Sequence, residues 1–259
     1  MRFNKQLNWI AFKTLATKEV VRFTRIWQQT ILPPVITTTL YFIIFGNLIG
    51  PRIGKMGGFD YMDFIVPGLI LMAVITNSYA NVASSFFSAK FQSSIEELLV
   101  SPTANITILL GYISGGIARG IMVGLVVTLV SLFFSKLQIY NIAVLVSVII
   151  LTSTLFALGG FTNALLAKKF DDISIVPTFI LTPFTYLGGV FYSIKLLPDL
   201  WQTVSHFNPV LYMINAFRYG FLGVSDISLW TSYIIIIGFI VALFLINLRL
   251  ISTGYGLRS

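Results

Sequence analysis

Cysteine is absent from this sequence of 259 residues, histidine occurs once, and charged residues make up only 10%. Without cysteine the chain can form no disulfide, thiol nucleophile or thiolate metal site. A single histidine, His206, also excludes a multi-histidine metal centre. Soluble domains carry about 25% charged residues on average. Because a chain with so few charges cannot cover its surface in water, the composition indicates that lipid surrounds most of it.

A complete nucleotide-binding loop is also missing. Gly54-Lys55 resembles the end of a phosphate-binding loop, but Ile49 occupies the place of its first glycine and Met56 that of its serine or threonine. The sequence likewise offers no convergent set of His, Asp and Glu that would form a catalytic centre. The chain is therefore not expected to be an enzyme, and any energy source would lie on another polypeptide.

Long apolar runs fill most of the chain. Hydrophobic residues make up 56%, and the mean hydropathy is +0.89. A helix needs about 20 residues to cross the hydrocarbon core of a membrane. The sequence predicts six such helices, at about residues 26–49, 62–87, 106–134, 142–166, 173–192 and 229–250. We expect Gly50-Pro51 to end the first of them and Asp171-Asp172 to open the fifth.

Two segments lie outside these helices. Residues 1–25 interleave basic and apolar positions around Trp9, which indicates an amphipathic helix at the membrane interface, with a solvated basic tail as the alternative. Residues 193–227 are rich in aromatics and interrupted by Pro198 and Pro209, which favours a short re-entrant or interfacial hairpin outside the cytoplasm.

The distribution of Lys and Arg predicts the orientation. Most of these residues, including Arg2 and Arg258, fall on the same side of the six predicted helices as the N-terminus, so both termini are expected in the cytoplasm. The net charge of +8 is explained in the same way, and we expect no nucleic-acid partner. The predicted fold class is an all-α membrane protein, with residues 1–259 forming a single transmembrane domain.

The third predicted helix combines glycines with a buried cation. Glycines four residues apart leave a groove that lets a second helix approach closely, either within the subunit or between subunits. The glycines are Gly111, Gly115, Gly116, Gly120 and Gly124. Arg119 on the same helix is expected to face protein or water, either as a group that lines or gates a path or as a structural arginine bonded to carbonyls. Asn77 and Asn81 share one face of the second helix and either line a path or bond a neighbouring helix.

The loop at residues 88–104 contains a second candidate site. It runs from Lys90 to Pro102 and predicts a short amphipathic helix that displays two carboxylates. Adjacent carboxylates without a histidine or a metal cluster do not form a catalytic site. The loop is interpreted either as a docking element for a cytoplasmic partner or as an ordinary solvated helix.

Taken together, these residues resemble the permease subunits of ABC-2 type transporters over nearly the whole chain. The most specific resemblance is a C-terminal pattern that comprises Gly188, Gly189, Val190, Phe191, Tyr192, Pro198, Asn208, Pro209 and Arg218. The cytoplasmic loop is similar to the family pattern Thr-Leu-Glu-x-Leu-Leu and supplies Lys90, Glu96, Glu97, Leu98 and Leu99. Ser93 departs from the family, which has glycine at that position.

The resemblance implies a half-transporter that forms a homodimer in lipid in the bacterial inner membrane. It also implies two copies of a separate ATPase subunit, which would hold the ATP and Mg. On this view the loop at 88–104 couples the permease to the ATPase, and the hairpin at 193–227 forms an outer gate. The substrate is expected to move outward.

An ion-coupled secondary carrier is the main alternative, and a membrane-embedded enzyme that modifies lipids or glycans is a weaker one. Carriers usually bury acidic residues at mid-membrane depth. All nine acids here are expected at helix ends or in loops, which counts against proton coupling: Glu19, Asp60, Asp63, Glu96, Glu97, Asp171, Asp172, Asp199 and Asp226.

Overall fold

The computed structural model describes residues 5–256 as a bundle of helices with a single two-stranded hairpin in this part of the chain. Arg2 and Arg258 and the first four residues of the predicted N-terminal helix lie outside the described residues. Five helical segments in the described part are long and apolar enough to cross a membrane: Trp27–Ile53, Tyr61–Phe91, Asn105–Ser131, Ile142–Leu166 and Leu229–Thr253.

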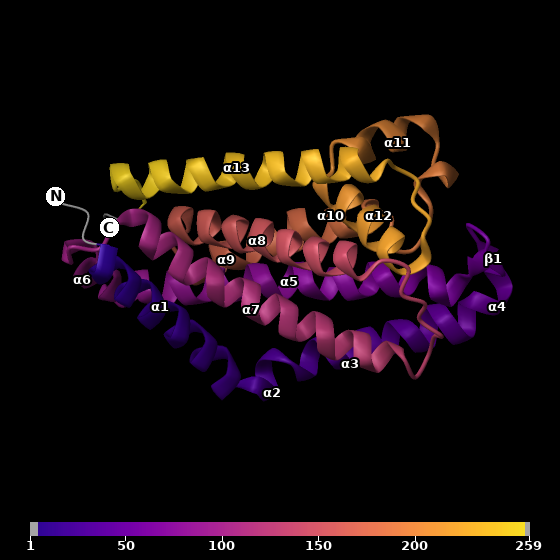
Figure 1. Ribbon diagram of the computed structural model, residues 1–259, viewed down its shortest axis with the longest axis horizontal. Helices are drawn as coiled ribbons and strands as arrows, with labels where there is room; N and C mark the ends of the chain where they lie inside the picture. Colours follow the sequence, from indigo (N-terminus) through magenta and orange to yellow (C-terminus); the bar gives the residue numbers. More distant parts are fainter. Residues whose placement is uncertain (1–4, 257–259) are drawn as a thin grey trace.

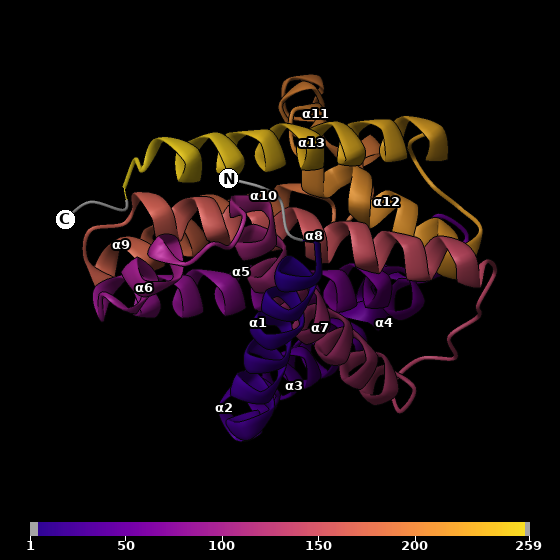
Figure 2. The same cartoon turned by 60° about the vertical axis from the view of Figure 1, so that its left-hand side comes forward.

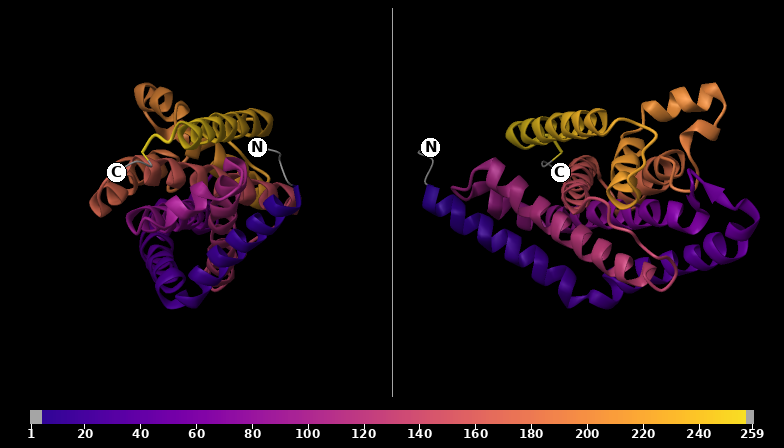
Figure 3. Two further views of the ribbon diagram at one scale, coloured as in Figure 1. Left: turned by 90° about the vertical axis from the view of Figure 1, so that its left-hand side faces the viewer. Right: turned by 45° about the vertical axis from the view of Figure 1, so that its right-hand side comes forward.

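The chain enters the bundle through a V-shaped pair of helical arms (Figure 3). The first arm is α1 (Lys5–Arg25), which packs along α7 (Asn105–Ser131). The second arm comprises α2 (Trp27–Thr30), α3 (Leu32–Tyr41), the π-helix η1 (Phe42–Ile49) and α4 (Gly50–Ile53).

The expectation that Gly50-Pro51 ends the first crossing helix is wrong. The helix continues to Ile53, because Pro51 falls in the first turn of α4, where its missing N–H has no partner to lose. Gly54, with φ of 77°, ends the helix instead, since glycine adopts a positive φ without a steric penalty. The hairpin of β1 (Lys55–Met56) and β2 (Phe59–Asp60) then leads to α5.

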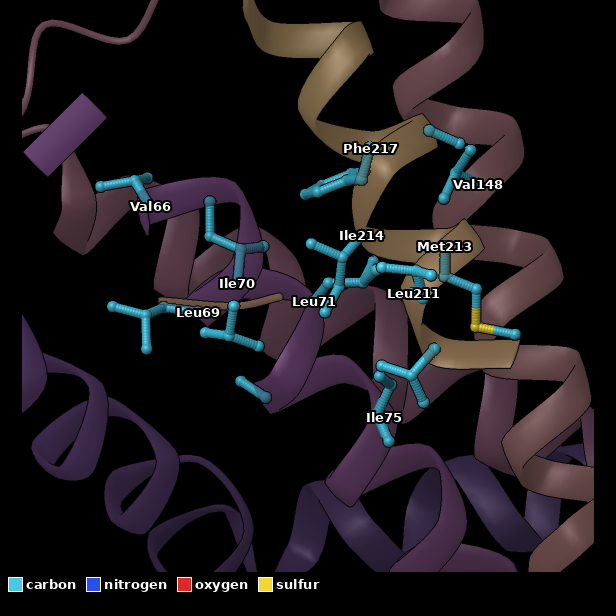
Figure 4. Packing of buried hydrophobic residues seen from close by; sticks show 14 of the residues in the cluster. Val66, Leu69, Ile70, Leu71, Ile75, Val148, Leu211, Met213, Ile214 and Phe217 are labelled. Carbon is cyan, nitrogen blue, oxygen red and sulfur yellow. The ribbon is translucent and has the colours of Figure 1, made fainter. Parts of the chain in front are cut away.

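The centre of the bundle is α5 (Tyr61–Phe91), which packs against α7 and α8 (Ile142–Leu166). Most of α5 is buried, so its sequence is apolar on nearly every face rather than along one stripe. Figure 4 shows side chains of α5 and α12 (Pro209–Leu222) interdigitating, among them Ile70, Leu71 and Ile214. This core holds the helices that carry the candidate sites in fixed positions.

The expected fifth crossing, residues 173–192, is a composite helix that is not among the five long apolar segments. It comprises α9 (Phe170–Val176), the π-helix η2 (Pro177–Leu181) and α10 (Thr182–Leu187). It ends at Leu187, earlier than expected, because Gly189 adopts a left-handed conformation with φ of 79°.

Residues 193–227 contain η3 (Ile194–Leu196), α11 (Asp199–His206) and α12. In α12 nearly every residue is buried between α5, α8 and α13 (Leu229–Thr253), whereas α11 exposes Leu200 and Trp201. The segment therefore folds as a helical hairpin with one buried and one peripheral arm.

The two ends of the bundle differ in content (Figures 1 and 2). One end gathers the start of α1, the helix α6 (Ser94–Val100) and the end of α13. The opposite end gathers α4, β1 and α11. The described chain thus begins and finishes at the end that carries α6.

Candidate functional site

The glycines of α7 face other helices of the same chain. A Cβ atom on Gly111 would lie 2.7 Å from Cβ of Leu15 on α1, and one on Gly124 would lie 2.9 Å from Val74 on α5. Gly116 meets both α5 and α8, with Val82 at 2.7 Å from its built Cβ. The glycine tract therefore serves packing inside the subunit, where side chains of any size would separate the helices.

Gly115 and Gly120 make room for polar side chains. A Cβ on Gly115 would overlap the side chain of Glu19, and one on Gly120 would overlap the hydroxyl of Ser78. Glu19 is 0% exposed, although it precedes every predicted crossing helix. No local signal indicates this burial, because an isolated glutamate among lysines and arginines is typical of a surface segment.

Glu19 is the centre of a polar network between α1 and α5. Its carboxylate accepts a hydrogen bond from the Ser85 hydroxyl at 2.6 Å and forms an ion pair with Arg22 at 3.2 Å. Arg22 also donates to the side-chain oxygen and the backbone carbonyl of Asn81, both at 2.9 Å. The negative charge is thus paired and hydrogen-bonded, which is the condition under which a buried carboxylate is tolerated.

Asn77 and Arg119 are in contact one helical turn before Asn81 on α5. The guanidinium of Arg119 donates to Oδ1 of Asn77 at 2.8 Å, and the Asn77 amide donates to the carbonyl of Ala73 at 2.9 Å. The Nε of Arg119 is buried and has no hydrogen-bond partner. The structure therefore places Asn77 and Asn81 in bonds to neighbouring helices, and it places Arg119 beside the cavity described next.

A groove, hereafter the α5 groove, runs along the outward face of α5. It consists of two adjoining cavities, of about 310 Å³ and 350 Å³, that share Tyr41, Met72 and Thr76. The first cavity lies between α3, α5 and Arg119 of α7, and the second between α5 and the η2–α10 segment. Thr76 belongs to a row of residues four apart on α5 that point out of the bundle: Met72, Thr76, Ala80, Ser84 and Ser88.

Aromatic side chains close one end of the α5 groove. The hydroxyls of Tyr41 on α3 and Tyr186 on α10 are 3.2 Å apart. Phe191 lies beside both rings, with centroid distances of 5.9 Å to Tyr41 and 5.6 Å to Tyr186. The three rings link two helices that otherwise stand on opposite sides of the groove. Sequence analysis singled out Phe191 but not the two tyrosines, which carry no motif of their own.

The helix α6 presents its carboxylates to the outside. Ile95 is buried against α5 and α7, and Leu98 and Leu99 are partly buried beside it, whereas Glu96 and Glu97 are exposed. Ser93, immediately before α6, has φ of 57°. Glycine adopts this left-handed conformation more easily than serine does, which gives a physical reason for the glycine of the family pattern.

Lys90 lies in the last turn of α5 rather than in the loop that follows it. Its ammonium group donates to the carbonyls of Leu165 and Ala167, at 2.8 Å and 2.7 Å. These carbonyls belong to the C-terminal end of α8, where a cation is favoured by the helix dipole. Lys90 therefore attaches the end of α5, from which the chain continues into α6, to the end of α8.

We expect Lys90→Met to lower the free energy of unfolding by about 1–2 kcal/mol, because two carbonyls lose a charged donor. The measurement is SDS-induced unfolding of the detergent-solubilised chain. Lys168→Met is the matched control, since the Lys168 side chain is exposed. Equal stability of the two variants would contradict this structural role of Lys90.

The residues of the C-terminal motif are brought together at the end opposite α6. Arg218 on α12 is buried, lies over the ring of Phe64 with its Cζ 3.8 Å from the centroid, and donates to the carbonyl of Gly189 at 2.7 Å. Asn208 caps the start of α12 and donates to the carbonyl of Phe184 at 2.6 Å. Of the others, Pro209 is the first residue of α12, Pro198 precedes α11, Tyr192 is partly buried, and Gly188 packs against Val210.

The motif therefore holds the end of α10 against α12. Both polar contacts are made by side chains of α12 or its cap to carbonyls of the preceding segment. Such contacts satisfy backbone groups at the break after Leu187, where regular helix bonding stops.

Asp172 lies in the first turn of α9 and bonds to the backbone that precedes this helix. The carboxylate of Asp172 accepts hydrogen bonds from the backbone N–H groups of Lys168 and Lys169, at 2.8 Å and 3.0 Å. Asp172 thus caps the start of α9, as the sequence indicated. Within residues 5–256 no three or more His, Asp or Glu side chains gather as a metal site would require.

Comparison with known families assigns the class of this protein. The family model for ABC-2 type transporters matches residues 10–222, which include α5, α6, α7, α8 and the C-terminal motif through Arg218. The chain belongs to the ABC-2 type transporter family. A match of this extent covers both candidate sites, so the resemblance noted in the sequence is confirmed.

Among individual proteins, the chain is similar to the inner membrane transport permease YadH of Escherichia coli K12. The two are 60% identical over 253 residues, which cover 98% of this chain and 99% of YadH. More distant relatives include nodulation protein J of Rhizobium leguminosarum bv. trifolii, 24% identical over 84% of this chain and 82% of the relative. Nodulation protein J of Neorhizobium galegae is 22% identical over 94% of each chain.

Proposed function

We propose that this chain is the membrane-spanning permease subunit of an ATP-binding cassette exporter in a bacterial inner membrane. In this proposal the composite helix of α9, η2 and α10 is the sixth membrane crossing, and both termini lie in the cytoplasm. Two copies of the chain form the pathway, and two copies of a separate ATPase subunit supply ATP hydrolysis with Mg. The relatives support the membrane and the transport class through their names.

The observation that carries the proposal is the position of α6. This helix is anchored by the buried side chain of Ile95 and follows the end of α5, which Lys90 bonds to α8, whereas its carboxylates are exposed. It lies at the end where α1 begins and α13 finishes (Figure 1). A rigidly held helix with exposed charges fits a surface that receives force from a soluble partner.

The α5 groove supports the pathway part of the proposal. One chain encloses the groove incompletely, and Thr76 remains exposed on a helix that is otherwise mostly buried. The Thr76 hydroxyl donates to the carbonyl of Met72 within α5 at 3.0 Å, so the support comes from the open side of the groove and not from an unpaired hydroxyl. A second copy that faces the groove would complete the enclosure, with Tyr41 and Tyr186 at one end. Closure of the ATPase pair would push on α1 and α6 and separate the two grooves.

The experiment is co-purification of the chain with an ABC ATPase from its own genome, followed by transport in vesicles. We expect Glu96→Lys/Glu97→Lys to weaken complex formation roughly tenfold, because like charges then face the partner surface. Asp60→Lys/Asp199→Lys makes the same change in charge at the opposite end of the bundle and should leave the complex intact. Unchanged binding of the first variant would refute docking through α6.

The alternative, that the chain is an ion-coupled carrier, is tested with the purified chain in the absence of any partner. The buried acid that such a carrier would use is Glu19, but its carboxylate is already engaged by Arg22 and Ser85. This pairing favours a structural role. Vesicles that contain only this chain should accumulate nothing under an ion gradient, and uphill transport without ATP would overturn the exporter proposal.

A further inference from the structure

The first cavity of the α5 groove contains a cation without a matching anion. Arg119 borders it, and none of the described residues that line it is acidic. The one carboxylate buried nearby, Glu19, is paired with Arg22. Positive charge therefore dominates this cavity.

Hydrogen bonding leaves part of the guanidinium unused. Arg119 donates to Asn77 through one terminal nitrogen, and its Nε is buried without a partner. Within residues 5–256 it forms no ion pair at 4.0 Å or less. A cation at membrane depth is costly when nothing neutralises it, so an anion that enters the cavity gains both charge compensation and charge-assisted hydrogen bonds.

The remaining walls suit a mixed ligand. Pro34, Leu69, Met72 and Ala73 supply apolar surface, while Gln29 and Thr37 add polar groups that are exposed on α2 and α3. The second cavity continues from Thr76 toward α10 and is lined mainly by apolar and threonine side chains. The charged end of a ligand would thus lie at Arg119 while an apolar chain extends along the groove.

We propose that Arg119 and the first cavity form a binding site for an anionic amphiphile, a molecule with a phosphate or carboxylate head and an apolar tail. This inference rests on the proposed transport function and names the chemical class of its cargo. A lipid with an acidic headgroup and a soluble amphiphile share this chemistry, and a small free anion lacks the tail.

Equilibrium binding to the full chain in phosphatidylcholine nanodiscs tests the site, with empty discs subtracted. The probes are dodecyl phosphate, dodecanol and inorganic phosphate. We expect dodecyl phosphate to bind roughly tenfold more tightly than either of the others. Anionic lipid, introduced as phosphatidylglycerol in the discs, should compete with dodecyl phosphate if the natural source is the bilayer, and should leave its binding unchanged if the source is soluble; both outcomes retain the site.

Three variants test whether Arg119 causes the preference for dodecyl phosphate over dodecanol. Arg119→Gln should reduce the affinity for dodecyl phosphate to that for dodecanol, with dodecanol binding unchanged. Thr76→Glu places a carboxylate on an exposed wall of the cavity, where it would neutralise Arg119, and should have the same effect even if Arg119→Gln does not fold. Arg52→Gln removes an exposed cation outside the cavity and should retain the preference.

The inference is overturned if the wild type binds dodecyl phosphate no better than dodecanol, or if inorganic phosphate binds as tightly as dodecyl phosphate. A preference that persists in Arg119→Gln or in Thr76→Glu would overturn it as well. The assay needs neither ATP nor a partner, so a negative result leaves the exporter proposal standing. Conversely, loss of ATPase docking would not change binding in this assay.

Discussion

Replacement of Gly160 by alanine is expected to lower the free energy of unfolding by about 3 kcal/mol, the upper range for overpacking a tight contact. Gly160 lies on α8 where this helix crosses α5. A Cβ atom there would overlap the carbonyl oxygen of Tyr79 and lie 3.2 Å from the amide nitrogen of Ala83. Because both are backbone atoms, no rotamer change can relieve the overlap, and the two helices must separate.

The adjacent residue provides the control for this prediction. A Cβ on Gly159 would lie 3.8 Å from the nearest atom of the Tyr79 ring, which is ordinary van der Waals contact. Gly159→Ala should therefore retain wild-type stability or gain slightly, since alanine favours helix over glycine. SDS-induced unfolding of both variants measures the difference, and equal destabilisation would contradict the close approach of α5 and α8.

Loss of Arg218 is expected to have the next largest effect. Arg218→Met removes the donor to the Gly189 carbonyl and the cation above the Phe64 ring, and should destabilise the chain by about 2–3 kcal/mol. Arg218→Lys should not restore stability, because an ammonium group lacks the planar fork that stacks on the Phe64 ring while it donates to the backbone carbonyls of Phe64 and Gly189.

The measurement is limited proteolysis of residues 193–227 together with SDS-induced unfolding. Lys195→Met is the control: Lys195 pairs with Asp226 at 3.5 Å, but its side chain is 71% exposed. Exposed pairs contribute at most about 1 kcal/mol. If Arg218→Met and Lys195→Met are cleaved at the same rate, the contacts of Arg218 do not hold this hairpin.

The helical bundle and its long crossings follow from the sequence because apolar runs of sufficient length have few alternatives in lipid. The run that became α5 is an example: residues 62–87 were expected as helix, and the helix spans Tyr61–Phe91. The four extra residues at its end include Lys90, which the sequence placed in a loop. No local signal showed that the carbonyls of α8 would supply partners for that lysine.

The continuation of the helix through Gly50-Pro51 to Ile53 illustrates a different limit. Proline disrupts a helix through its missing N–H and through the clash of its ring with the carbonyl four residues earlier, and the preceding π-helical turn changes which backbone groups lie opposite it. This register cannot be read from Pro51 alone. The composite fifth helix likewise contains the π-helical segment η2, which begins at Pro177.

The candidate site is predictable from the sequence where its residue types are unusual for a membrane-spanning helix. Arg119, Asn77 and the glycines of α7 are unusual in an apolar helix, and the structure gathers them at α5. Glu19 and the pair of Tyr41 with Tyr186 were missed, because their significance arises from helices that are distant in sequence. The partner of Glu19 on α5, Ser85, is 66 residues away.

The network around Glu19 also determines how α1 can move. If α1 slid along α7 or lifted from it, the carboxylate would leave Ser85, and Arg22 would leave Asn81. The Glu19–Arg22 pair lies within α1 and would move with it, so the cost is that of hydrogen bonds between α1 and α5 that involve a charged group, about 1.5–3 kcal/mol each. A force on α1 that supplies less than this energy would move α1 and α5 together as one rigid body. A force applied at the start of α1 would then be transmitted to α5, which forms the wall of the groove. The contacting residues of the two helices are some sixty residues apart in the sequence.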